Sequence, residues 1–115
     1  MVKNNCGLHI RCDGSVLIAT LTGELDHHGA VAVRTLIDAE IRKRNPKKAV
    51  LDLSGLDFMD SSGLGLIMGR HTLMASLGGT LTLRRPNERI VRIFRLAGLE
   101  RIVTIEEDKN EAKGK

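Results

Sequence analysis

Short apolar runs alternate along this chain with longer segments whose apolar residues recur at helical spacing. Residues 15–22 and 48–53 are nearly continuous apolar runs, which are typical of strands covered on both faces. In the segment between them, Ala30, Val33 and Ile37 follow the period of an amphipathic helix. Strands that alternate with helices in this way predict parallel strands joined by right-handed crossovers.

The remaining segments complete this order. We expect strands at residues 8–12, 15–22, 48–53, 80–83 and 102–105, helices at 26–44, 62–77 and 87–96, and a loop at 54–57. Asp13-Gly14 is a hairpin signal, which makes the first strand antiparallel to the second. The prediction is an α/β fold, a small mixed sheet of four or five strands with helices packed largely on one side. Six side chains are expected in its core: Val16, Ile18, Val50, Leu51, Ile67 and Phe94.

The length of 115 residues fits a single domain, with a core at about 8–105 and a polar tail at 106–115. No apolar run approaches the ~20 residues that a membrane span needs. Residues 1–6 also lack the apolar stretch of a signal peptide. We therefore expect a cytoplasmic protein with no membrane span, in which Cys6 and Cys12 are free thiols.

The formal net charge of +4 raises the question of nucleic-acid binding. Acidic residues lie between several of the basic ones, and the chain has no Trp or Tyr and only two Phe, so bases would find few stacking platforms. We therefore expect no direct contact with nucleic acid. The cysteines match no usual zinc spacing, and we expect neither a metal nor a cofactor.

The candidate functional residues gather in the run Asp60-Ser61-Ser62-Gly63-Leu64, between a predicted strand and a predicted helix. Unpaired N–H groups and the positive end of the dipole make a helix start favourable for negative charge, including a phosphate. The same residues suit a plain capping role for Asp60, Ser61 or Ser62.

A second loop, residues 23–28, also leaves the carboxyl end of a predicted strand and opens a helix, with Asp26 as its candidate cap. If the two strands are parallel, both loops lie on the same edge of the sheet, where open α/β sheets bind their ligands. Asp26 and Asp60 are then expected near the serines.

The residues fit an enzyme or a phospho-aspartate receiver less well. Asp-Ser-Ser-Gly is not the G-x-S-x-G elbow of a hydrolase, and no complete catalytic constellation is present, so we expect no enzyme. A phospho-aspartate receiver could use Asp52, but the acidic cluster that holds its Mg²⁺ and the lysine after its last strand are missing. A receiver-like domain, or a small enzyme using Asp26 and Asp60, remains the alternative.

The two motifs, Gly23–His28 and Phe58–Gly65, resemble those of the anti-sigma factor antagonists, whose fold is the STAS domain (sulfate transporter and anti-sigma antagonist). The resemblance covers about residues 8–105, and the Asp26-His27-His28 element is more similar to the sporulation members than to the stress-response ones. It implies a STAS-like fold and a protein that acts by binding.

The implied partners are an anti-sigma factor with serine kinase activity and a serine phosphatase. The unphosphorylated antagonist binds the anti-sigma factor and frees the sigma factor, and phosphorylation on Ser62 ends the complex. The resemblance implies that six residues meet the partner: Asp26, Asp60, Ser61, Ser62, Gly63 and Leu64. We further expect the Ser62 hydroxyl to be accessible and Ser61 to cap or pack.

Overall fold

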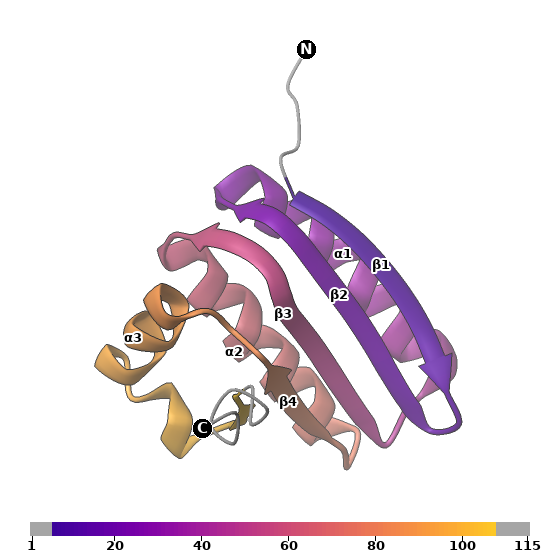
Figure 1. Cartoon of the computed structure of the whole chain (residues 1–115). Helices are drawn as coiled ribbons and strands as arrows, with labels where there is room; N and C mark the ends of the chain where they lie inside the picture. The colour runs from indigo at the N-terminus through magenta and orange to yellow at the C-terminus, as the bar shows by residue number, and fades with distance from the viewer. Residues whose placement is uncertain (1–5, 108–115) are drawn as a thin grey trace, which may run out of the picture.

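The computed structural model describes residues 6–107 (Figure 1). Within this range the elements are β1 (Cys6–Asp13), β2 (Val16–Leu25), α1 (His27–Arg44), β3 (Lys48–Met59), α2 (Ser61–Ser76), β4 (Thr80–Arg84), α3 (Glu88–Leu96), a short 3-10 helix (Leu99–Arg101) and β5 (Thr104–Glu106). The predicted order of strands and helices is confirmed.

The strands form one mixed sheet in the order β1-β2-β3-β4-β5. β1 runs antiparallel to β2, as its hairpin signal predicted, and the other neighbours are parallel. The two long helices, α1 and α2, lie side by side against one face of the sheet (Figure 1). The predicted α/β architecture, with helices largely on one side, is therefore confirmed.

The core lies between that face and the helices. Alternate residues of the central strands, such as Leu17 and Leu51, pack there with Ile37 of α1 and Ile67 of α2. Five of the six side chains expected in the interior are buried. Val16 is only partly buried, because it begins β2 beside the exposed hairpin.

One boundary prediction was wrong. Residues 54–57 are not a loop, because β3 continues from Lys48 to Met59 and stays paired with β2 through two register shifts. Gly55 permits this, since a Cβ at that position would lie 2.8 Å from the Thr22 methyl group. Pairing with the neighbouring strand thus overrides the turn preference of Ser54-Gly55, and the longer strand carries the chain directly to Asp60.

The end of the chain also differs from expectation. Gly98 adopts φ 73° and opens the 3-10 helix, so β5 begins at Thr104 rather than at residue 102. Glu106, which we assigned to the polar tail, closes β5. Residues 108–115 of that tail lie outside the described residues.

Both cysteines are free, Cys6 buried and Cys12 exposed, in agreement with the expected thiols. Among the described helices, none is long and apolar enough to cross a membrane.

Candidate functional site

Asp26 is the N-cap of α1, as its position in the sequence predicted. Its backbone is extended, and its Oδ1 accepts a hydrogen bond from the Gly29 N–H at 2.9 Å. Its carbonyl accepts a second bond from the Ala30 N–H at 2.8 Å. The carboxylate is therefore fixed at the positive end of a helix.

Asp60 has the same role at the start of α2. Its Oδ1 accepts a hydrogen bond from the Ser62 N–H at 2.8 Å, and its carbonyl accepts one from the Gly63 N–H at 2.9 Å. The sequence left three capping candidates open, and the structure selects Asp60. Within residues 6–107, neither serine hydroxyl is taken up by a cap or another hydrogen bond.

The parallel pairing of β2 and β3 brings the two caps together. Leu25, just before Asp26, lies opposite Met59, just before Asp60. The Asp60 N–H donates directly to the Leu25 carbonyl at 3.2 Å. The starts of α1 and α2 thus meet at the carboxyl edge of the sheet (Figure 1). We call Asp26 together with residues 60–64 the cap edge.

The expectation that Ser61 caps or packs is wrong. Ser61 is exposed, because Asp60 caps the helix and Ser61 only begins its first turn. Ser62, the next residue, is partly buried.

Gly63 and Leu64 complete the cap edge. Gly63 is buried, and a Cβ there would collide with the Met59 side chain, so this glycine lets α2 begin close to the end of β3. Leu64 remains partly exposed beside the serines. Gly65 has open space where a Cβ would stand, so it is not required for packing.

Sequence reasoning missed Phe58 as a separate feature of this region. Phe58 pairs with Glu24 in the row next to Leu25 and Met59, and 49% of its surface is exposed. Its exposure follows from the continuation of β3, which turns Met59 inward and Phe58 outward. A strand prediction that ran to residue 59 would have revealed it.

Asn87, also missed, ties α3 to the strand that leads into the cap edge. Its Oδ1 caps α3 by accepting from the Ile90 N–H at 2.9 Å. Its Nδ2 donates to the Leu56 carbonyl at 3.1 Å and to the Asp57 carbonyl at 3.4 Å. The Asn-x-x pattern before a helix was the available sequence signal.

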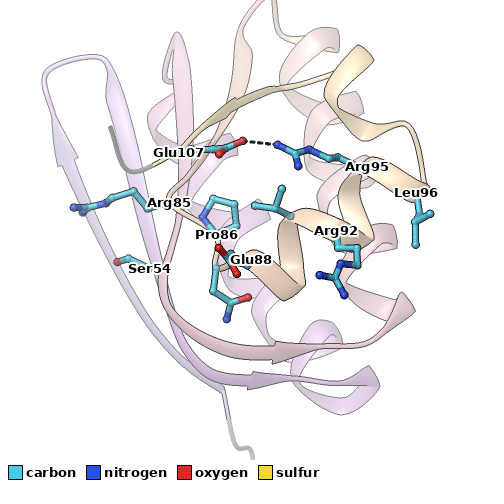
Figure 2. Close-up of a pocket in the computed structure, with 10 residues that line it drawn as sticks. Ser54, Arg85, Pro86, Glu88, Arg92, Arg95, Leu96 and Glu107 are labelled. Atoms are coloured by element: carbon cyan, nitrogen blue, oxygen red, sulfur yellow. Dashed lines mark hydrogen bonds and ion pairs between the residues drawn. The ribbon is translucent and has the colours of Figure 1, made fainter. Parts of the chain in front are cut away.

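A groove of about 880 Å³ lies beside α3 and the ends of β4 and β5 (Figure 2). Arg95 and Glu107 face each other in it, with Nη2 and Oε2 3.1 Å apart. Its lining includes Ser54 and Arg85 but no residue of the cap edge. The groove and the cap edge are therefore separate regions.

Asp52, the residue that a receiver-like domain would phosphorylate, is engaged in local contacts. Its Oδ1 accepts from the Ser54 N–H at 3.0 Å and from the Ser54 hydroxyl at 2.8 Å, while Oδ2 lies 3.5 Å from Arg85 Nη2. Burial raises the pKa of Asp52, but the Ser54 hydrogen bonds and the arginines outweigh it, so the net pKa is lowered. This carboxylate has the contacts of a structural group.

The cap edge brings two capping carboxylates and an exposed serine to one edge of the sheet. Ser61 directly follows the Asp60 cap, and Asp26 caps the neighbouring helix start. Within residues 6–107, no three His, Cys, Asp or Glu side chains are grouped to hold a metal. His27 and His28 stand edge to face, with ring centroids 5.9 Å apart. Such an edge can bind a protein and can accept a phosphate.

Comparison with known proteins identifies a family and several relatives. The family model for the STAS domain matches residues 8–112. An anti-sigma F factor antagonist of Paenibacillus polymyxa is 41% identical over 97 residues, which cover 84% of this chain and 83% of that protein.

Two solved structures have the same fold. The anti-sigma factor antagonist SpoIIAA in its unphosphorylated form is similar with a TM-score of 0.78 and 25% identity, over 95% of this chain and 98% of that one. The phosphorylated form of SpoIIAA from Bacillus has a TM-score of 0.71 and 25% identity, over 93% and 97%. The similarity to the stage II sporulation protein AA is consistent with the sequence resemblance. The chain therefore belongs to the STAS domain family, with anti-sigma factor antagonists among its relatives.

Proposed function

We propose that this protein is an anti-sigma factor antagonist that binds an anti-sigma factor with serine kinase activity through the cap edge. Binding frees the sigma factor, and phosphorylation of a serine on the cap edge ends the complex. The observation that carries this proposal is the Asp60 N–H to Leu25 carbonyl bond, which joins the two capped helix starts directly before the serine pair. The relatives' names support the anti-sigma factor as partner.

The phosphoacceptor belongs to the serine pair. The motif resemblance points to Ser62, whereas exposure favours Ser61. Ser61 is exposed at the start of α2, and Ser62 remains partly exposed there. We propose Ser62 as the phosphoacceptor, as the motif resemblance implies, and test Ser61 beside it.

Electrostatics explain why a phosphate would end binding. A phosphoserine adds about −1.5 to −2 charges. The helix start tolerates this charge in the free protein, but the Asp60 carboxylate caps the same helix start and the Asp26 carboxylate caps the neighbouring one. In a complex, the phosphate would be desolvated beside them without a new counter-charge. A charge left unpaired in this way costs ~3–5 kcal/mol, which corresponds to a loss of affinity of a hundredfold or more.

The remaining parts of the proposal follow from the resemblance. A serine phosphatase restores the unphosphorylated form, the sigma factor is the one used in sporulation, and the protein acts in the cytoplasm. The protein itself is a non-catalytic binding module. The relatives do not favour the receiver-like and small-enzyme alternatives.

The test is to incubate the protein and its variants with a purified anti-sigma F factor and ATP. Phosphate incorporation is measured by intact mass, and affinity by calorimetry. Ser61→Ala and Ser62→Ala are compared with Ser76→Ala, an exposed serine at the far end of α2. We expect Ser62→Ala to abolish phosphorylation and to bind persistently, with Ser76→Ala unchanged.

Ser62→Asp is expected to fold normally and to bind at least a hundredfold more weakly. Phosphorylation that survives Ser62→Ala but not Ser61→Ala would move the acceptor to Ser61. Phosphorylation that survives both changes, or an acid-labile phosphate on aspartate, would overturn the serine switch.

Asp26→Asn and Asp60→Asn should stay folded, because replacing a cap residue costs only ~0.5–2 kcal/mol of stability. Both variants should nevertheless alter binding or phosphorylation.

A further inference from the structure

The exposed aromatic ring beside the cap edge is unusual in this chain. The protein has two phenylalanines and no other aromatic of the Phe, Trp and Tyr type. Phe94 is fully buried, whereas Phe58 leaves 49% of its surface exposed. The fold does not need a large apolar side chain at this exposed strand position.

The backbone at Phe58 is held from both sides. On one side it pairs with Glu24 of β2, and on the other the Asn87 side chain donates to the carbonyls of Leu56 and Asp57. Because the backbone is already fixed, a partner that covers the Phe58 ring restricts only two side-chain torsions. Rigid aromatic groups of this kind lose little entropy on binding and are enriched among the residues that dominate interface energies.

Phe58 also lies within reach of any partner that covers the serines. It is three residues before Ser61, and a chain spans at most about 3.6 Å per residue, so the two Cα atoms are within about 11 Å. A specific interface buries about 800 Å² on each partner. A round patch of that area has a radius of about 16 Å, which exceeds this distance.

We propose that Phe58 is the apolar anchor of the cap edge and inserts into an apolar pocket on the anti-sigma factor. This inference rests on the proposed function and adds the residue that holds the complex together. Ser62 and the two caps provide the switch, whereas Phe58 provides contact area that phosphorylation does not alter. The anchor should act after docking, so its loss raises the dissociation rate more than it lowers the association rate.

The test compares Phe58→Ala and Phe58→Leu with Leu96→Ala, a matched truncation of a side chain that is 84% exposed on α3. Association and dissociation rates with a purified anti-sigma F factor are measured by surface plasmon resonance. We expect Phe58→Ala to weaken binding at least tenfold through faster dissociation, Phe58→Leu to stay within about threefold, and Leu96→Ala to match the parent protein. As a phosphorylation substrate, Phe58→Ala should show a raised KM with kcat nearly unchanged.

Urea unfolding of each variant excludes a folding defect, because a half-exposed ring contributes little to stability. Unchanged affinity in Phe58→Ala, or an equal loss in Leu96→Ala, would overturn the anchor while leaving the switch intact. If the parent protein does not bind the anti-sigma factor at all, the proposed function fails first. Self-association that Phe58→Ala abolishes, with no effect on the anti-sigma factor, would assign the ring to a second copy of this chain and also overturn the proposal.

Discussion

Asp26 and Asp60 each accept a hydrogen bond from one N–H group in the first turn of their own helix. Because Asp60 is the cap of α2, neither neighbouring serine hydroxyl is needed for capping. An aspartate cap is short and acts through one carboxylate oxygen, so the second oxygen stays available to the surroundings. The same residue can therefore stabilise a helix start and set the charge that a phosphate would meet. In the proposed switch, the side chains that cap the two helices are also the ones that repel the phosphate.

The two cysteines should differ in reactivity. Burial raises the pKa of the Cys6 thiol, the charge of Asp26 raises it further, and the backbone of Thr22 opposes these effects. Cys12 is exposed. We therefore expect a disulfide reagent at pH 8 to label the Cys12 thiol rapidly and the Cys6 thiol slowly. Cys12→Ser should remove the rapid phase, and a rapid phase that instead disappears in Cys6→Ser would contradict the assignment.

Two glycines near the start of α2 form a matched pair. Gly63→Ala introduces a Cβ into the buried Met59 side chain, and such overpacking typically costs ~1–3 kcal/mol. Gly65→Ala meets open space, so it should stabilise the helix by up to ~1 kcal/mol. Urea unfolding measures both. Equal effects of the two substitutions would show that Gly63 is not required for close packing of α2 on β3.

Among the elements, α1 and α2 are joined by a charged contact as well as by apolar packing. Arg70 of α2 is buried, and its Nε lies 2.8 Å from Asp38 Oδ1 of α1. The alignment is not that of a hydrogen bond, so the contact is mainly a charge attraction. Burial lowers the pKa of Arg70, and Asp38 partly offsets this.

Asp38→Asn should therefore destabilise the protein. It leaves a buried guanidinium without its counter-charge, which costs ~3–5 kcal/mol in a fully buried pair. Because Asp38 keeps about a quarter of its side chain exposed, we expect ~1–3 kcal/mol. The control is Glu40→Gln, which removes the exposed Glu40–Arg44 pair on α1 and should leave the urea midpoint unchanged. Equal stability of Asp38→Asn and the parent protein would make the contact neutral.

Local patterns predicted the elements but not all of their ends. The apolar runs and cap residues located the five strands and three α-helices of residues 6–107, because those signals reside in neighbouring residues. The last part of β3 was missed because Ser54-Gly55 is turn-like by itself and becomes strand only by pairing with Thr22 and its neighbours. The relative exposure of Ser61 and Ser62 depends on which residue caps α2, and Asp, Ser and Ser are all suitable caps. Both the end of β3 and the relative exposure of the two serines depend on contacts in the folded protein rather than on neighbouring residues.

At the scale of the whole molecule, charged residues link the strands across the sheet face that is opposite to α1 and α2. Asp52 of β3 lies opposite Thr20 of β2 and Arg84 of β4. Arg84 in turn reaches Glu106 of β5, with Nε and Oε1 3.3 Å apart. A row of polar groups therefore crosses from the centre of the sheet to its last strand. The stability of the protein should depend on pH through the carboxylates of this row, Asp52 and Glu106.

Asp52 gives that dependence a definite sign. Its pKa is lowered in the folded protein, so the fold favours the ionised carboxylate, and the resulting stability is present above the unfolded pKa of about 3.9. It is lost as pH falls through the folded pKa. We expect Asp52→Asn to be less stable than the parent protein by a constant margin between about pH 5 and 7, and this margin to shrink below about pH 4.

Urea midpoints measured from pH 3 to pH 7 test this expectation. The control is Glu24→Gln, which removes an exposed carboxylate that forms no ion pair within residues 6–107. Its midpoint should follow that of the parent protein at every pH. A margin for Asp52→Asn that stays constant down to pH 3 would mean that the Ser54 hydrogen bonds hold the protonated and ionised carboxyl equally well. A margin that grows at low pH would reverse the sign and place the folded pKa above the unfolded one.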